Sequence, residues 1–577
     1  MSTTENGWTR RRLLANAAVT LGTTAAASAA LAGGVSLADT PAPAAGDPAA
    51  AGRKPLDGPC GTPFQAATVT PADARYPDLN HGLNNRWVGS PAAIRVVSTT
   101  QQIIDTVQEA ARAGKKLTVR SGGHCYEDFV DNARTQIVID MSEMSQVYYD
   151  ADRKAFAVEA GALLLDVYER LYKTYGVTVP AGMCFDVGAG GHVSGGGWGM
   201  LCRELGLVVD YLYAVEVVTV DARGNARAVV ATREPDDPNR DLWWAHTGGG
   251  GGNFGVIARY WFRSGTSDGG NPAQALPTPP AEVYISALSW DWSLITPEIF
   301  ATLTRNFANW HVAHADPGNP YAGLVSFLKL NHRSNGQIGL LTQMDASAPD
   351  ALQKLQDFVN AVCAGVNLPH GPITTAMGEH GPMPEFYVPT KLPWLQATRY
   401  LGVTNTTLVD PTLRGDFKSA YNRKALSEEQ IAAFYRHLTT DLQNPAAMAL
   451  LSSYGGAVNK VARTATAQVH RDSAFKVLYQ TYWSDAADDD ANLGWIRAFY
   501  SEVYQATGGV PVLDGTTDGC YVNYADIDIS DPAYNLSSTP WSTLYYGENY
   551  PRLQQVKAAW DPTNFFNHRQ SVELPSS

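Results

Sequence analysis

The stretch 117-LTVRSGGHCYEDF-129 ends a short apolar run with two glycines, and a histidine follows them directly. The apolar run indicates a short strand. Glycine runs weaken regular structure, but they are useful where the backbone must approach a ligand closely. A lone histidine is more often a satisfied polar group than a ligand-binding one. The role of His124 therefore depends on the motifs that accompany it.

Two further glycine clusters follow within about 135 residues, at 188-GAGGHVSGGGWG-199 and 246-HTGGGGGNFG-255. Each lies beside a strand-like segment, so flexible loops explain them poorly. Neither cluster matches the dinucleotide fingerprint of a βαβ unit, and neither carries the Gly-Lys-Ser/Thr of a nucleotide-binding P-loop. We expect backbone amides in these clusters to line a bound phosphate group.

The composition is that of a globular protein with a small-molecule partner. The 577 residues are 45% hydrophobic and 17% charged, which suffices for a well-packed core. Acidic residues outnumber basic ones, 56 against 43, the net charge is −13, and no basic block occurs beyond the N-terminus. A nucleic-acid partner is therefore not expected.

The N-terminus is similar to a twin-arginine export signal. Arg10 and Arg11 precede a long stretch of Ala, Thr, Gly and Leu, and residues 36–38 offer a small-residue cleavage site. A membrane anchor is the alternative, but a spanning helix is richer in Leu, Ile, Phe and Val. We expect a signal peptide over 1–38, a linker and N-terminal extension over 39–74, a secreted protein, and no stable membrane insertion.

Helical and strand patterns alternate over the first half of the chain. Apolar residues recur at helical spacing after residue 100, with Thr100 as a candidate cap and Gly114 at the end, and a second helix ends at Gly176. Strands are predicted at 117–122, 136–142 and 155–162, and a hairpin at 212–231 turns around Gly224. The first half is therefore an α+β fold.

A second region, 266–510, has elements of its own. A hairpin is predicted at Asn335-Gly336, a helix opens with a capping box from Ser427 to Gln430, and strands are predicted at 450–458 and 475–483. Near the C-terminus, 521-YVNYADIDI-529 has the pattern of a strand. In a strand, Tyr521 and Asn523 would point to one face and Tyr524 to the other.

Four segments in the same order resemble the berberine-bridge-enzyme-like branch of the FAD-linked oxidases. They are TVRSGGHCYEDF (118–129), PAGMCFDVGAGGHVSGGGWGMLCRELGLVVD (180–210), LWWAHTGGGGGNFGVI (242–257) and YVNYADIDI with the tail that follows it. The likeness runs from about residue 75 to 575 and is strongest to secreted actinobacterial members that oxidise a sugar on a polyketide antibiotic.

This resemblance implies an α+β fold with three parts. An FAD-binding domain of the PCMH type, built from two α/β subdomains, is expected at 75–265. A substrate domain with an antiparallel sheet covered by helices is expected at 266–510, and a C-terminal segment at 511–577 returns to the FAD domain.

The resemblance also assigns the cofactor, FAD, a covalent attachment at two residues. His124 matches the family histidine bonded to the flavin ring methyl, and a neutral imidazole nitrogen is a suitable nucleophile. Cys184, 60 residues later, matches the cysteine that forms a thioether to the ring. Cys202 is interpreted as buried and unreactive. With Cys184 on the flavin, five of the six cysteines remain, so at least one is unpaired, and Cys125 is the candidate.

The other residues assigned to the cofactor come from the glycine loops and the C-terminal segment. Val187 matches a position that influences oxygen access in relatives, and valine there favours reaction with dioxygen. The set assigned to FAD is His124, Cys184, Arg120, Ser121, Gly122, Gly123, Val187, Gly188, Gly190, Gly191, His192, Gly195, Gly249, Gly252, Asn253, Gly255, Val256, Asn523 and Asn549.

Two tyrosines are the candidate catalytic residues. Tyr524 matches the tyrosine that serves as base in alcohol-oxidising relatives, and Tyr454 matches an active-site tyrosine that precedes two glycines. A phenol is a weak base at neutral pH, so Tyr454 is assigned to stabilise the Tyr524 phenolate by hydrogen bonding. The segment 462–471 lacks the glutamate of amine-cyclising relatives, which favours alcohol oxidation, and no metal site is expected.

Three functions remain open at this point. The first is oxidation of a secondary alcohol on a glycosylated polyketide or similar metabolite, with dioxygen as acceptor and hydrogen peroxide as product. The second is oxidation of the anomeric carbon of a free sugar or oligosaccharide. The third, a flavin-carrying binding protein with little turnover, is disfavoured by Tyr454, Tyr524 and Val187.

Overall fold

The stretch 117–129 leaves the edge of a four-stranded sheet. In the computed structural model, which describes residues 66–403 and 409–576, the strand order is β1-β2-β4-β3, with β2, β4 and β3 parallel. The helix before β3 begins with a side-chain cap from Thr99, one residue ahead of the expected Thr100, and ends at Gly114 with φ of 60°. The elements are β1 (Ala67–Val69), α1 (Tyr76–Leu79), β2 (Ala93–Val96), α2 (Thr100–Ala113), β3 (Leu117–Arg120) and β4 (Ile137–Asp140).

A second sheet completes the N-terminal part, with strand order β5-β6-β9-β7-β8 and antiparallel pairing. The expected hairpin around Gly224 is confirmed as β7 and β8, and the expected helix end at Gly176 is confirmed. The elements are β5 (Val147–Asp150), β6 (Ala155–Glu159), α3 (Leu164–Tyr175), α4 (Ala189–Ser194), α5 (Cys202–Leu205), β7 (Leu212–Val220), β8 (Ala226–Thr232), α6 (Arg240–Ala245) and β9 (Val256–Phe262).

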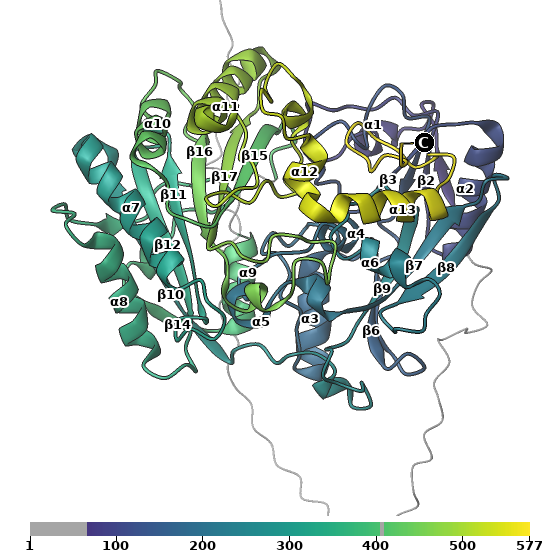
Figure 1. Cartoon of the computed structure of the whole chain (residues 1–577), viewed down its shortest axis with the longest axis horizontal. Helices are drawn as coiled ribbons and strands as arrows, with labels where there is room; N and C mark the ends of the chain where they lie inside the picture. Colours follow the sequence, from purple (N-terminus) through teal and green to yellow (C-terminus); the bar gives the residue numbers. More distant parts are fainter. Residues whose placement is uncertain (1–65, 404–408, 577) are drawn as a thin grey trace, which may run out of the picture. The chain divides into compact units, whose positions relative to one another are not determined.

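The third sheet is antiparallel and runs in the order β13-β10-β12-β11-β16-β17-β15, with β14 added on β10. Helices α7, α8, α10 and α11 cover one face of it (Figure 1). The expected hairpin at Gly336 and the capping box at Ser427 are confirmed. The elements are β10 (Glu282–Asp291), α7 (Pro297–Ala313), β11 (Leu324–Asn331), β12 (Gln337–Asp345), α8 (Ala351–Cys363), β13 (Gly371–Pro372), β14 (Thr390–Pro393), α9 (Trp394–Val403), β15 (Arg414–Asn422), α10 (Glu428–Leu438), β16 (Met448–Ser453), β17 (Phe475–Trp483) and α11 (Asp489–Val503).

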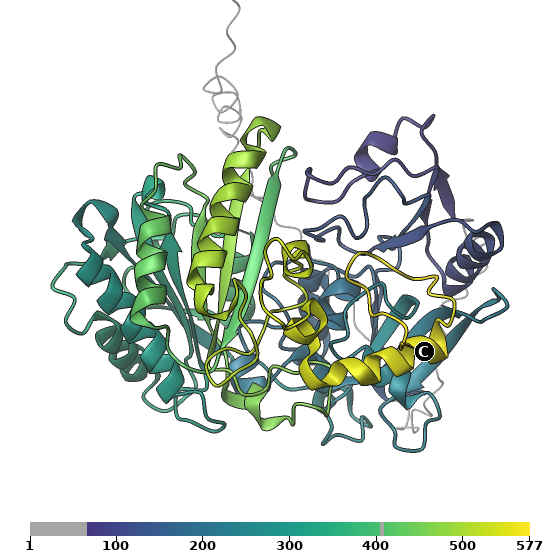
Figure 2. The same cartoon turned by 45° about the horizontal axis from the view of Figure 1, so that its top comes forward.

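The C-terminal segment returns to the N-terminal part of the fold. Helix α12 (Trp541–Tyr546) leads into α13 (Tyr550–Trp560), and the yellow C-terminal helices lie beside the blue N-terminal part in Figure 2. Helix α13 packs against α6. Hydrogen bonds to Asn253 hold this segment in place. Val572 N donates to Asn253 Oδ1 at 2.8 Å, and Lys557 Nζ donates to Asn253 O at 2.7 Å. The third glycine cluster is therefore tied to the end of the chain.

The strand predicted at 521–529 is wrong. Residues 522–524 form a turn in which Tyr524 N donates to Tyr521 O at 2.9 Å, and a 3₁₀ helix follows over Ile527–Ser530. A turn brings positions three apart together, whereas a strand separates them. The rings of Tyr521 and Tyr524 accordingly lie with centroids 5.1 Å apart, not on opposite faces.

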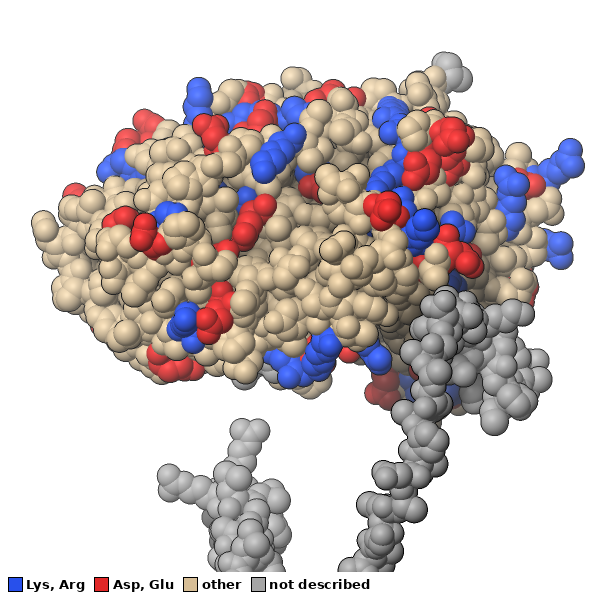
Figure 3. Space-filling view, turned by 90° about the horizontal axis from the view of Figure 1, so that it is seen from below, with Lys and Arg blue, Asp and Glu red and all other residues tan. Residues whose placement is uncertain are grey.

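The expected signal peptide and the linker up to residue 65 lie outside the described residues. Within those residues, no helix combines the length and the apolar character needed to cross a bilayer. On the face in Figure 3, acidic and basic side chains are interspersed among uncharged ones. The five cysteines of the described chain, Cys125, Cys184, Cys202, Cys363 and Cys520, are all free thiols, and Cys202 is buried as expected.

Candidate active site

A cavity of about 360 Å³ lies between the glycine loops and the face of the third sheet that is opposite helices α7, α8, α10 and α11. Segments from the N-terminal and C-terminal parts of the chain meet at this cavity, because the loop after β3, the loop before α4 and the turn at 522–524 all line it. Seventeen of the residues assigned from sequence line the cavity: Arg120, Ser121, Gly122, Gly123, His124, Cys184, Val187, Gly188, Gly190, Gly191, His192, Gly252, Asn253, Gly255, Val256, Asn523 and Tyr524.

The glycines have two different physical roles in this cavity. A Cβ on Gly122 would fall 2.3 Å from Gly188 N, so these two loops touch through their backbones. A Cβ on Gly195 would fall 1.9 Å from Asn523 Oδ1, so that glycine packs against protein and lies outside the lining. At Gly191 a Cβ would meet nothing within 4 Å, which leaves open space beside the cavity.

His124 has one ring nitrogen close to a carboxylate and one without a partner. Its Nε2 lies 3.2 Å from Asp186 Oδ1, and its Nδ1 is buried with no hydrogen-bond partner in the described chain. A buried polar atom without a partner is uncommon, because it loses its hydration with nothing in exchange. The geometry leaves Nδ1 available to a group inside the cavity.

Cys184 enters the same cavity, so the fold brings together the two residues that sequence reasoning paired. Its thiol donates to Glu379 Oε2 at 3.5 Å. Burial raises the pKa of this thiol, and the carboxylates of Glu379 and Asp186 add to the rise. Glu379 also accepts a hydrogen bond from the Tyr482 hydroxyl at 2.9 Å, so it is held in place at the cavity wall.

Tyr524 is paired with a lysine that sequence reasoning missed. Lys476 Nζ donates to the Tyr524 hydroxyl at 3.2 Å and lies over the Trp198 ring at 3.6 Å and the Tyr524 ring at 4.6 Å. Burial lowers the pKa of Lys476 to about 7 and raises that of Tyr524, to which Tyr521 and Glu379 contribute further. A phenol and an amine in contact can pass a proton between them.

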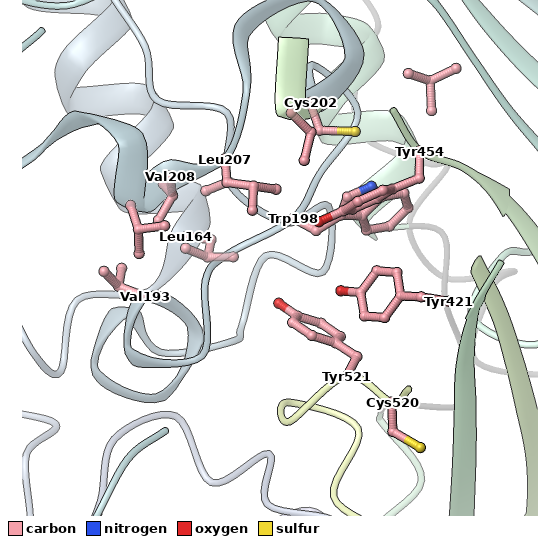
Figure 4. Close-up of a cluster of buried hydrophobic side chains, with 14 of the residues drawn as sticks. Leu164, Val193, Trp198, Cys202, Leu207, Val208, Tyr421, Tyr454, Cys520 and Tyr521 are labelled. Atoms are coloured by element: carbon pink, nitrogen blue, oxygen red, sulfur yellow. The ribbon is translucent and has the colours of Figure 1, made fainter. Parts of the chain in front are cut away.

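Tyr454 does not reach the cavity. It is fully buried, its hydroxyl donates to His470 O at 3.1 Å, and its ring lies 5.0 Å from that of Tyr421. Figure 4 shows the rings of Tyr454, Tyr421 and Tyr521 gathered near Trp198. The structure therefore places Tyr454 in the aromatic cluster behind the site, where it forms no hydrogen bond to Tyr524 among the described contacts.

Several residues assigned to the cofactor bind the protein backbone instead. Asn549 Nδ2 donates to three carbonyls between Arg463 and Ala467, and neither Asn549 nor Gly249 lines the cavity. Asn523 Nδ2 donates to His192 O at 3.0 Å, which joins the C-terminal turn to α4. The Arg120 guanidinium, although at the cavity, is bound by Asp140 and by the carbonyls of His81 and Leu79.

Further polar groups reach the cavity from the third sheet and the loop before β14. The signal in the sequence is weak, since Lys476 and Gln480 simply interrupt the buried strand β17. The cavity-lining residues of this kind are Lys329, Glu379, His380 and Gln480.

The described residues fit FAD. His124, whose Nδ1 has no partner, lines the cavity. Gly191 also lines it and leaves open a space that a larger side chain would fill. Residues 91–227 match the family described as "FAD binding domain", and residues 520–573 match "Berberine and berberine like". The fold and site are thus those of an FAD-binding flavoprotein.

Comparison with known proteins identifies more specific relatives within this class of flavoproteins. The chain is 46% identical to an aclacinomycin-N/aclacinomycin-A oxidase of Streptomyces galilaeus, covering 99% of both chains. It is 31% identical to a hexose oxidase of Chondrus crispus, covering 89% of this chain and 95% of that one. The crystal structure of a glycopeptide hexose oxidase complexed with teicoplanin superposes with a TM-score of 0.83 at 43% identity, covering 89% and 100%.

The chain belongs to the berberine-bridge-enzyme-like family of FAD-linked oxidoreductases. An identity of 46% over almost the whole length extends well beyond the two matched segments, and so includes the third sheet. The α+β architecture expected from the sequence, with an antiparallel sheet covered by helices in its second part, is confirmed.

Proposed function

We propose that this protein oxidises a secondary alcohol on the sugar of a glycosylated secondary metabolite. FAD, held covalently at His124 and Cys184, would accept the two electrons, and dioxygen would then be reduced to hydrogen peroxide. The observation that carries the proposal is the contact of Lys476 with the Tyr524 hydroxyl in the site whose cavity His124 and Cys184 line.

Bound FAD supplies the electron acceptor, and the chain supplies the base. A neutral phenol accepts a proton only as it gives up its own, so Tyr524 needs a neighbour that takes one. Lys476 meets this need because burial lowers its pKa to about 7, which leaves a neutral amine available near neutral pH. In this relay the neutral amine accepts a hydrogen bond from the Tyr524 hydroxyl, the reverse of the direction that the ammonium form would give. The phenolic proton then passes to Lys476 Nζ while the substrate proton passes to the Tyr524 oxygen.

Covalent attachment at both residues is supported by their common place in the lining of the cavity. His124 Nε2 against Asp186 leaves Nδ1 as the free nucleophile, and Cys184 approaches from a separate loop. The relatives support the substrate class, since one is named an aclacinomycin-N/aclacinomycin-A oxidase and another, a glycopeptide hexose oxidase, was crystallised with teicoplanin. Export by the twin-arginine route remains part of the proposal.

Oxidation of a free sugar at its anomeric carbon is the second candidate, favoured by the likeness to a hexose oxidase. Product analysis separates the two. The purified protein would be incubated with free hexoses and with their methyl glycosides, whose anomeric carbon is blocked, while peroxide release is recorded. A ketone formed from the glycosides supports the proposal, whereas lactones formed from free hexoses alone would replace it with the second candidate.

A further inference from the structure

The face of the third sheet opposite its helices lines the cavity. It carries a cluster of polar side chains that the reaction described above does not use. Lys329 on β11, His380 in the loop before β14 and Gln480 on β17 all line the cavity. Their exposed fractions are 1%, 3% and 2%. We call Lys329, His380, Gln480 and the neighbouring Glu379 the sheet-face cluster.

Each member retains hydrogen-bonding capacity that the described chain leaves unused. His380 Nε2 and Gln480 Nε2 are buried with no partner. In its ammonium form Lys329 has three N–H groups, and its contacts with Met377 O at 2.7 Å and His380 Nδ1 at 2.6 Å use two of them at most. Unpartnered buried donors are unfavourable, so their presence at a cavity indicates a ligand that supplies acceptors.

The protonation of His380 follows from these contacts. Burial lowers the pKa of His380 well below its usual range, so the ring is neutral. Because Lys329 donates to Nδ1, the single ring proton is on Nε2, which makes that atom a donor facing the cavity. Glu379 adds the opposite function, because its carboxylate accepts from Tyr482 and Cys184 and has lone pairs left for another donor.

The cluster lies a fixed distance along the sheet from the base. In the backbone pairing of the sheet, Lys476 lies opposite Ser452 and Phe327, and Gln480 lies opposite Met448 and Asn331. Because Lys476 and Gln480 are four residues apart on one strand, their side chains share a face. Four residues of strand at about 3.3 Å each separate them by roughly 13 Å. A group bound at Gln480 is therefore a different part of the substrate from the carbon that reacts at Tyr524.

Resting on the proposed function, we propose that the sheet-face cluster is a subsite for neighbouring hydroxyl groups of a sugar, and that it selects sugar-bearing alcohols over simple ones. A hydroxyl both accepts and donates, which matches three donors beside one carboxylate. Carbonyl oxygens of an aglycone only accept, and would place lone pairs against Glu379. The apolar side chains of Met448 and Leu450, beside the cluster, suit the C–H face of a ring.

The test compares two ring alcohols, a methyl hexopyranoside and cyclohexanol, on the intact flavoprotein. The variants Gln480→Leu and Lys329→Met remove donors at similar volume, and each should lower kcat/KM for the glycoside about tenfold, mainly through KM. Cyclohexanol, which has no second hydroxyl, should change less than about twofold. Gln343→Leu is the matched control, a buried glutamine on β12 outside the cavity lining.

The possible failures are distinguishable. If the parent oxidises cyclohexanol as well as the glycoside, or if the variants affect both alcohols equally, the subsite is wrong and the oxidase function stands. If neither alcohol reduces the flavin of the parent, the proposed function fails with it. If a hydroxyanthraquinone probe loses binding in Gln480→Leu and the glycoside does not, the cluster contacts an aglycone and the inference is overturned.

Discussion

Tyr524→Phe tests the proposed base directly, because it removes one hydroxyl and keeps the ring. The ring contacts with Tyr521, at 5.1 Å between centroids, and with Lys476, at 4.6 Å, do not involve the hydroxyl. The lost hydrogen bond to Lys476 is worth about 1 kcal/mol of stability. The variant should therefore fold and bind FAD.

The chemical step should suffer far more than the fold. Loss of a general base slows a reaction by about 10²–10⁴-fold, which corresponds to a barrier increase of about 3–5 kcal/mol. Flavin reduction would be followed under anaerobic single-turnover conditions, which separate the oxidation of the alcohol from the reaction with oxygen. The comparison variant is Tyr454→Phe, which loses only a hydrogen bond to a carbonyl outside the cavity lining and should cost less than about tenfold.

A parental rate of flavin reduction in Tyr524→Phe would refute the reasoning. Tyr454→Phe with the larger loss would show that the aromatic cluster behind the site, and not the turn at 522–524, supplies the base. Equal losses in both would indicate that the cluster acts only by holding Tyr524 through Tyr521 and Tyr421, whose centroids lie 6.0 Å apart.

Three other predictions concern the cofactor, the pH dependence and export. Acid-precipitated protein should keep its flavin; His124→Ala or Cys184→Ala should each leave one bond, and the double variant none, as read from the absorbance of the pellet. Because burial lowers the pKa of Lys476 to about 7, flavin reduction should rise with pH through about 7 as the amine loses its proton, and Lys476→Met should abolish that rise. This lysine has a higher pKa in the unfolded chain, so the unfolded chain binds more protons than the folded one between pH 7 and 10. The contribution of Lys476 to the free energy of unfolding should therefore increase with pH over that window. Finally, Arg10→Lys with Arg11→Lys should retain the protein in the cytoplasm, as measured by immunoblot of culture supernatant; continued secretion would contradict the assigned signal.

Local signals in the sequence were sufficient for much of the fold. Gly114 and Gly176 end helices at positive φ of 60° and 72°, as glycines after an amphipathic run predict. The strand predicted at 475–483 is confirmed to the residue as β17. The pairing of His124 with Cys184 came from the family resemblance, and both residues line one cavity.

The failures have a common physical cause, which is that local patterns do not report distant contacts. The alternation over 521–529 predicted a strand, but hydrogen bonds within the turn and to Glu127, 400 residues away for Ile527 N, fix a different backbone. Glu379 meets Cys184 across 195 residues, and nothing near either position in the sequence indicates this. The strand predicted at 450–458 ends at Ser453, and Tyr454 lies just beyond it in the buried core, before Gly455 with φ of 77°.

The buried lysines show why the cavity groups are assigned to function and not to folding. Lys418 is buried between Asp526 and Asp528, with Nζ 2.7 Å from each carboxylate, and those charges raise its pKa despite burial. Lys329 and Lys476 are equally buried, yet neither forms an ion pair with a carboxylate in the described chain, and burial lowers the pKa of each to about 7. Folding gains nothing from an amine placed in this way, because desolvation is not offset by an opposite charge. An amine that titrates near neutral pH is useful where protons are exchanged or hydroxyls are bound. Lys476 contacts the Tyr524 hydroxyl, and Lys329 belongs to the sheet-face cluster.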